Sequence, residues 1–233
     1  MKYIPEDCNV LMSTDLDELL NPGWADTLRE RWIDGVHERG LYLYTWSHLD
    51  DGSDGRVFLY DKIHSRNWRW KAPVHEYLYN INENTENYYN MNTLNLSDED
   101  KVHLHHYPDN SKSRGSYLPL LELREQESPN DYYGLIYLAR EYMFYNMNDK
   151  AIDKFNYIIN NLSNQGNNLE IASCHCFLGE CYTQKENYQE AIFSYLRAID
   201  LEPTYRESYI ALGKIYFKLE KYDLAKYYIK LGI

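Results

Sequence analysis

Two short runs in the first half of the chain show the alternation of apolar and polar residues that predicts β-strands. They read GLYLYTWSHLD from residue 40 and GRVFLYDKIHS from residue 55, and both are rich in aromatic and β-branched side chains. The DGSDG stretch that joins them is typical of a turn. We therefore predict a β-hairpin over residues 40–65.

The segment before this hairpin has the apolar spacing of a helix. Within residues 22–40, Trp24, Leu28 and Trp32 recur at every fourth position, and Gly40 follows as a stop signal. Pro at the start of the segment suits the first turn of a helix. The pattern predicts a helix over the whole segment.

The stretch VLMSTDLDELL, from residue 10, has two interpretations. In the first it opens a helix, with Thr14 or Asp15 as the cap and Asp17 or Glu18 completing a capping box three residues later. In the second, residues 10–12 end a buried strand, and Asp15 and Asp17 leave its carboxyl edge toward one crevice. Such oxygen ligands suit Mg²⁺ or Mn²⁺ bridging a diphosphate.

An internal repeat occupies the second half of the chain. Two copies lie 34 residues apart, and their aligned residues are Gly213 with Gly179, Tyr216 with Tyr182 and Ala225 with Ala191. A third copy lies 40 residues before Gly179, with Ala139, Tyr142 and Ala151 at the same positions. The six additional residues fit a loop, SNQGNN, at 163–168.

This period, the small residues where helices would cross, and Pro203 at the end of a unit resemble tetratricopeptide repeats. The resemblance covers about residues 130–233 and implies three helical hairpins, stacked so that they share one continuous core. Tyr182 and Tyr195 are expected to fill the space between helices, as packing residues rather than functional ones.

Charge and composition exclude several classes of function. Lys and Arg number 24 against 36 Asp and Glu, and the formal net charge of −12 repels a nucleic-acid backbone. No apolar run reaches the roughly 18 residues that a membrane span needs, and no signal peptide is evident. The four cysteines lack the spacing of a disulfide framework or a zinc ribbon. We expect a cytoplasmic protein with reduced thiols and no nucleic-acid partner.

Two further segments are dense in chemically active residues: RNWRWKAPVHEYL at 66–78 and VHLHHYPDNSKSRGSYLPLLEL at 102–123. In order, the acidic corner and these segments resemble the family 2 glycosyltransferases that carry C-terminal tetratricopeptide repeats. The resemblance implies an α/β fold, a partial GT-A catalytic domain with a Rossmann-like sheet over residues 1–115. An all-α tetratricopeptide repeat array then follows over residues 116–233.

The resemblance also implies an activity, the transfer of a sugar from a nucleotide-diphosphate donor to an acceptor. Repeats beside the transferase favour a protein or peptide acceptor. Mn²⁺ or Mg²⁺ would bind Asp15 and Asp17 of a DxD motif, together with His105 or His106. We favour His106, which precedes the Tyr-Pro turn, and imidazole suits Mn²⁺ better than Mg²⁺. Glu76 would accept the acceptor's proton.

Five further residues are predicted to bind substrate: Trp68, Trp70, His75, Lys112 and Arg114. The two Trp occupy alternate strand positions, where both would stack on a sugar or both would belong to the core. The two basic residues would neutralise the donor diphosphate from a loop, or would be ordinary solvated charges.

Other readings of these segments stay open. Glu76 could form a simple ion pair with Arg69 or Lys71. Zinc could bind the three histidines of the HLHH run, although this cluster has no Cys nearby and only one clear acidic neighbour. These histidines are His103, His105 and His106.

The chain departs from the family at its start. In these transferases the strands that hold the base and ribose precede the acidic corner, whereas only fourteen residues precede Asp15 here. We expect the first part of the catalytic domain to be absent, leaving an open sheet edge and weak or no binding of a UDP-sugar. The alternative is a non-catalytic tetratricopeptide interaction module with a relic transferase segment.

Overall fold

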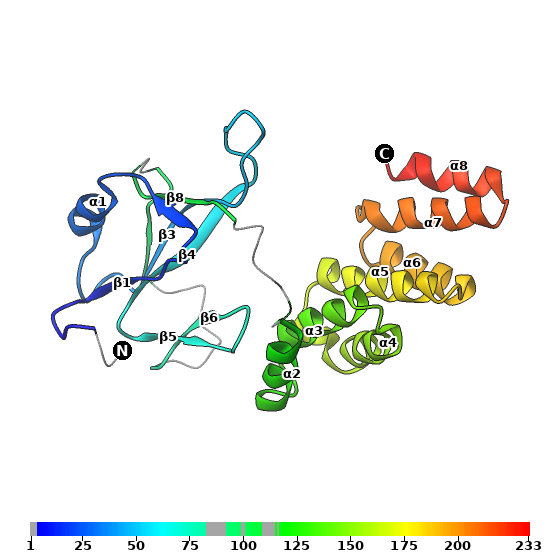
Figure 1. Ribbon diagram of the computed structural model, residues 1–233, viewed down its shortest axis with the longest axis horizontal. Helices are drawn as coiled ribbons and strands as arrows, with labels where there is room; N and C mark the ends of the chain where they lie inside the picture. Colours follow the sequence, from blue (N-terminus) through cyan, green and yellow to red (C-terminus); the bar gives the residue numbers. More distant parts are fainter. Residues whose placement is uncertain (1–3, 83–91, 99–100, 109–114, 116) are drawn as a thin grey trace. The chain divides into compact units, whose positions relative to one another are not determined.

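The computed structural model describes residues 4–82, 92–98, 101–108, 115 and 117–233, and the chain forms two compact units (Figure 1). The sheet unit comprises Met1–Ala72 and Glu76–Ser113, and the helical unit comprises Pro73–His75 and Arg114–Ile233. No helix among the described residues is long and apolar enough to cross a membrane.

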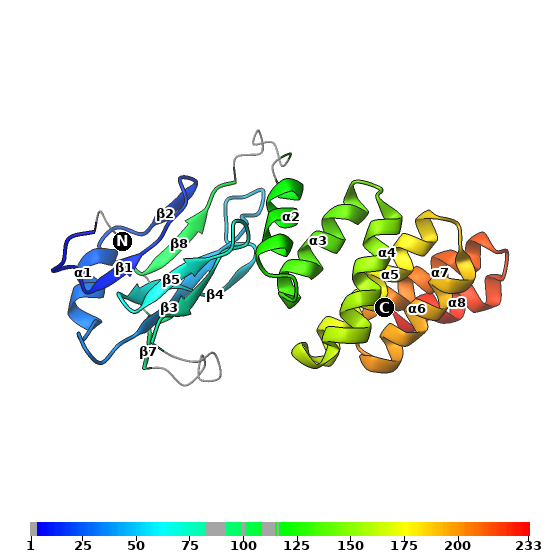
Figure 2. The same ribbon diagram turned by 90° about the horizontal axis from the view of Figure 1, so that it is seen from below.

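The main sheet has six strands in the order β1-β4-β3-β8-β2, with β7 also paired to β3 (Figures 1 and 2). A separate two-stranded sheet is formed by β5 and β6. The strands are β1 (Val10–Met12), β2 (Glu18–Leu20), β3 (Arg39–Thr45), β4 (Val57–Ser65), β5 (Trp68–Lys71), β6 (Tyr77–Asn80), β7 (Thr93–Asn95) and β8 (His103–His106).

The predicted hairpin and the first predicted strand are confirmed. Strands β3 and β4 pair antiparallel, and β1 pairs antiparallel with the far end of β4. The Rossmann-like GT-A sheet is not confirmed, because that fold is built on parallel strands. Here β3 is parallel to β7 and β8, while the remaining pairs of the sheet are antiparallel.

The helix predicted over residues 22–40 is too long. Helix α1 (Trp24–Arg31) ends where Trp32 adopts an extended backbone, and Gly35 then takes a positive φ of 75°. Trp32 stays buried with Leu28 in the core of the sheet unit, so the apolar spacing reflects burial beyond the helix end. Gly40 lies inside β3, where a Cβ would approach the Ile63 side chain to 3.0 Å.

The helical unit confirms the tetratricopeptide array. After α2 (Tyr117–Glu127), each pair of consecutive helices corresponds to one of the three aligned copies (Figure 2). The pairs are α3 (Tyr132–Phe144) with α4 (Asn148–Tyr157), α5 (Asn168–Gln184) with α6 (Tyr188–Leu201), and α7 (Arg206–Lys218) with α8 (Tyr222–Leu231). The additional residues before α5 form a π-helical turn, Ile158–Leu162, and a 3₁₀ turn, Ser163–Gln165.

Small residues stand where the helices of a pair cross. A Cβ on Gly179 would lie 2.8 Å from the Tyr195 ring, and one on Gly213 would lie 2.5 Å from the Ile229 side chain. Ala191 is fully buried. Because real Cβ atoms do not approach other atoms this closely, the sequence period reflects the space available between helices.

The turn inside each pair repeats as well. Asn146, Glu186 and Glu220 each adopt a left-handed backbone, with φ of 57°, 58° and 59°. Each lies two residues after the end of the first helix of its pair, and the spacings between them match those of the three sequence copies. Two of the three positions hold Glu, so the array tolerates the cost of about 1 kcal/mol that a side chain pays in this conformation.

Candidate functional site

Asp15 and Asp17 lie in the turn between β1 and β2 and contact different partners. The Nζ of Lys62 donates to Asp15 Oδ2 at 3.2 Å, and the Nε2 of His106 lies 3.9 Å from Asp17 Oδ2. The helix-cap interpretation of this stretch is wrong, because residues 18–20 form a strand. A single cation held by Asp15, Asp17 and His106 stays a prediction, as does its identity as Mn²⁺ or Mg²⁺.

The sequence did not indicate that Glu18 is the best buried acid of this corner. Its side chain is 1% exposed and accepts hydrogen bonds from Lys62 Nζ at 2.8 Å and from the Tyr44 hydroxyl at 2.8 Å. Burial disfavours the charged form of Lys62, but the hydrogen bonds and charge of Glu18 outweigh it and raise the Lys62 pKa. Burial and the hydrogen bond to Glu18 raise the Tyr44 pKa. Asp15 therefore contacts the buried Lys62–Glu18 ion pair from its solvent-exposed side.

His105 and His106 project to opposite sides of β8, because successive strand residues alternate. His106 pairs in register with Glu18, close to Asp17, and its Nδ1 faces the Trp46 carbonyl at 3.1 Å. The strand geometry therefore allows only one of these two histidines to approach Asp17.

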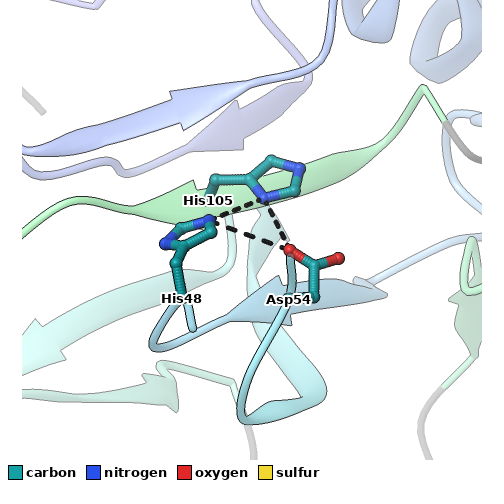
Figure 3. A group of neighbouring side chains, drawn as sticks. All are labelled: His48, Asp54 and His105. Atoms are coloured by element: carbon teal, nitrogen blue, oxygen red, sulfur yellow. Dashed lines mark hydrogen bonds and ion pairs between the residues drawn. The ribbon is translucent and has the colours of Figure 1, made fainter. Parts of the chain in front are cut away.

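His105 instead meets His48 and Asp54 (Figure 3). The Nδ1 of His105 lies 3.4 Å from His48 Nε2 and 3.4 Å from Asp54 Oδ1, and the last two atoms are 3.8 Å apart. This His-Asp-His group is the one set of three potential metal-ligating side chains found among the residues that the structure describes.

The local chain path explains how the group forms. His48 and Asp54 are bridge partners that close the turn after β3, and Asp51 caps this turn by accepting the Ser53 backbone N–H at 2.9 Å. Opposite residues of such a bridge bring their side chains together on one face. His105 reaches the same place from β8, where it pairs with Thr45 at the end of β3.

The two Trp predicted to bind sugar differ in burial. Trp68 is fully buried, and its indole N–H donates to Glu38 at 3.3 Å, so this ring belongs to the core. Trp70 is 38% exposed and donates to Ser13 Oγ at 2.9 Å. A sugar ring could therefore stack on Trp70 alone.

The neighbours His75 and Glu76 fall in different units. The His75 ring stacks on Tyr137 of the helical unit, with the centroids 3.9 Å apart. Glu76 belongs to the sheet unit and is exposed, and within the described part of the chain it forms no ion pair with Arg69 or Lys71. Lys112 and Arg114 lie outside the described residues.

A second candidate site is a groove on the helical unit. The cavity has a volume of about 420 Å³ and is lined by residues of α3, α5, α6 and α7. Its apolar and aromatic walls include Met143, Phe177, Tyr205, Ile210 and Ala211. Burial raises the pKa of Tyr205 to about 12, so its hydroxyl stays neutral and can donate a hydrogen bond at physiological pH.

Charged side chains stand along the edge of this groove. Glu207 and Lys214 are both exposed and lie seven residues apart on α7, hence on one side of the helix and about 10 Å apart along its axis. Lys218 is paired with Glu186 at 3.3 Å, and Glu180 accepts from the Tyr195 hydroxyl at 3.3 Å.

Comparison with known families assigns the helical unit. A family model described as TPR repeat matches residues 179–220. The helical unit contains tetratricopeptide repeats. No curated protein matches the chain.

Solved structures that resemble part of the chain include several of MamA. The crystal structure of MamA protein is 22% identical over 50% of this chain and 60% of that one, with a TM-score of 0.43. MamA 41-end from Desulfovibrio magneticus RS-1 is 14% identical over 51% of this chain and 63% of its own, with a TM-score of 0.45. The chain thus spans less than two thirds of either MamA chain.

The assignment to family 2 glycosyltransferases is wrong. The family model that matches describes TPR repeats and lies entirely within the helical unit. The short motifs that suggested a transferase have other structural explanations. Asp15 pairs with the buried Lys62 and Trp68 fills the core, so each has a structural role that requires no catalysed reaction.

Proposed function

We propose that this protein is a non-catalytic interaction module whose repeats bind a polypeptide segment in the groove lined by α3, α5, α6 and α7. The observation that supports this most is the lining of the groove. Aromatic residues and Met are enriched at the centres of protein interfaces, and this cavity combines both with aliphatic side chains. Tyrosine also binds at a low entropy cost, because few of its torsions must be fixed.

The occupant we propose is a segment that inserts one large apolar side chain into the cavity. Glu207 and Lys214 then select its flanks, because they present opposite charges about 10 Å apart along α7. A basic residue near Glu207 and an acidic residue near Lys214 would satisfy both. A segment whose two flanks carry the same charge would be repelled at one end. Flanks of opposite charge therefore favour one orientation of the bound chain.

The experiment is a selection from a displayed peptide library with the intact chain as bait, followed by affinity measurements on the enriched peptides. We expect a large apolar residue with a basic residue on one side and an acidic residue on the other. Ile210→Glu places a charge in the cavity wall and should weaken binding by more than about tenfold. Phe193→Glu is the matched control, because Phe193 is 60% exposed on α6 and lies outside the groove.

A charge swap tests the proposed orientation. Lys214→Glu should disfavour peptides with an acidic flank and enrich those with basic residues on both sides. Failure of the selection to enrich any apolar motif, or equal losses in Ile210→Glu and Phe193→Glu, would contradict the proposed function.

A further inference from the structure

We propose that His48, Asp54 and His105 form a binding site for one zinc ion in the sheet unit. The site is separate from the groove of the repeats and from the Asp15 and Asp17 corner. It rests on the positions of three ligand atoms, on their chemistry and on the way in which the fold holds them.

The three atoms already have the spacing of ligands around one ion. His48 Nε2, His105 Nδ1 and Asp54 Oδ1 form a triangle with sides of 3.4, 3.4 and 3.8 Å (Figure 3). The centre of that triangle lies about 2.1 Å from each corner, which is the usual length of zinc bonds to imidazole nitrogen and carboxylate oxygen. The three separations are therefore close to those of ligands around one zinc ion, and small movements of the side chains would give tetrahedral geometry.

The donor set selects the kind of metal. Two imidazoles and one carboxylate suit a transition metal, whereas Mg²⁺ and Ca²⁺ prefer oxygen ligands alone. Copper binds imidazole more tightly than zinc does, so affinity alone does not choose the metal; we propose zinc because two histidines, one carboxylate and an open position form a common zinc coordination. Three protein ligands leave a fourth position, and since the Asp54 side chain is 39% exposed, water can reach it.

Neighbouring rings hold both imidazoles in place. The His48 ring lies parallel to Tyr107, with the centroids 4.6 Å apart and the planes inclined by 7°. The His105 ring stacks on His103 at 4.2 Å, and His103 Nε2 bonds Thr45 Oγ1 at 2.7 Å. Side chains fixed in this way lose little freedom when a metal binds, which favours affinity.

The same geometry excludes a zinc site made of the three β8 histidines. His106 projects to the opposite side of the strand from His103 and His105. His103 is engaged with Thr45, so it supports the His105 ring rather than binding the ion itself. The remaining ligands come instead from the turn after β3, far from β8 in the sequence.

The test is calorimetric titration of zinc into the full chain, purified without an affinity tag that would itself bind metal and stripped with a chelator. We expect one zinc ion per chain. His48→Ala, His105→Ala and Asp54→Asn should each weaken binding by more than roughly tenfold. His37→Ala is the matched control, because this histidine of the sheet unit contacts the Ile33 backbone and lies outside the group.

A second readout is thermal stability in place of the heat of binding. Zinc should raise the thermal unfolding temperature of the sheet unit in the unmodified chain and in His37→Ala, but not in the folded Asp54→Asn variant. Binding that is lost in His106→Ala yet retained in His48→Ala would place the ion at Asp17 and overturn the proposal. Absence of stoichiometric zinc binding to the unmodified chain would overturn it as well.

Discussion

The two units of this protein are stabilised in different ways. In the helical unit each helix packs against the next one along the chain, so the contacts are local and recur with the repeat. In the sheet unit, β2 near the start of the chain pairs with β8, and β3 is flanked by β4 and β8. Local contacts leave a period in the sequence, whereas distant pairings do not, and this difference explains where sequence reasoning succeeded.

Buried ion pairs occur in the described part of both units, and taking one pair from each allows the two units to be compared directly. In the sheet unit Lys62 pairs with Glu18 at 2.8 Å. In the helical unit Arg124, which is 2% exposed, pairs with Asp131 at 2.7 Å and donates to the Val74 carbonyl at 2.8 Å.

The largest effects are expected from removing the cation of either pair. Lys62→Met leaves Glu18 buried without its partner, and Arg124→Met does the same to Asp131, so each should cost about 3–5 kcal/mol of unfolding free energy. We expect Lys62→Met to unfold the sheet unit while the helical signal in circular dichroism persists, and Arg124→Met to do the reverse. Labelling of Cys174 and Cys181, which are buried in the helical unit, reports its opening independently.

A matched control is the double variant Lys62→Met with Glu18→Gln. It removes both charges, so it should recover part of the loss. If either single variant reduces both signals together, the units unfold as one body and the comparison fails.

A somewhat smaller effect is expected from acid. His175 is buried in the helical unit, and burial, followed by the charge of Arg197, lowers its pKa to about 4 from an ordinary value of 6.5. The folded state therefore prefers the neutral ring, so this contribution is fully present above pH 6.5 and is lost as the pH falls toward 4. The loss should reach about 3 kcal/mol.

Unfolding in urea across this pH range checks the prediction, with His175→Gln as the variant because an amide side chain does not titrate. The variant should lose stability less steeply than the unmodified chain. His64 provides the counterpart in the sheet unit, because burial lowers its pKa as well. Parallel pH profiles for His175→Gln and the unmodified chain would contradict the assignment.

The smallest effects are expected from two glycine substitutions, one that crowds a neighbouring side chain and one that strains the backbone. Gly213→Ala forces a Cβ to within 2.5 Å of Ile229 and should cost about 1–3 kcal/mol. Gly35→Ala in the sheet unit meets no atom within 4 Å but has a φ of 75°, so only backbone strain of about 1 kcal/mol is expected. Thermal unfolding of both variants distinguishes the two, and an equal cost would show that the helix crossing relaxes.

The sequence predicted most of what depends on local spacing. The 34-residue period located the helix pairs, and the turn signal at DGSDG located the hairpin. The pattern overestimated the length of α1, because Trp32 lies beyond the helix end and is apolar since it packs in the core of the sheet unit. The orientation of each helix about its own axis determines which residues line the groove, and the pattern alone did not predict it.

The His-Asp-His group was missed because His48 belongs to a run interpreted only as a strand and Asp54 to a stretch interpreted only as a turn. A signal was available, however. His48 and Asp54 stand on either side of a short turn, and residues in such positions face each other across a hairpin. The alternation of β8 likewise indicates that His105 and His106 could not both reach Asp17. Which strand would lie beside that turn depended on the pairing of β3 with β8, and the sequence carries no local sign of it.

The turns between α4 and α5 are the place where additional residues can be inserted into the repeat array. The π-helical turn at Ile158–Leu162 and the 3₁₀ turn at Ser163–Gln165 absorb the residues that exceed the repeat, while the helices on both sides keep their register. A graft of a foreign epitope or a second domain is therefore best placed at 163–165. Its downstream limit is Gly166, since any side chain there would collide with the Tyr132 hydroxyl. The array thus contains an insertion point with one fixed boundary. Exposed loops of this kind tolerate inserted segments while the rest of the chain keeps its fold.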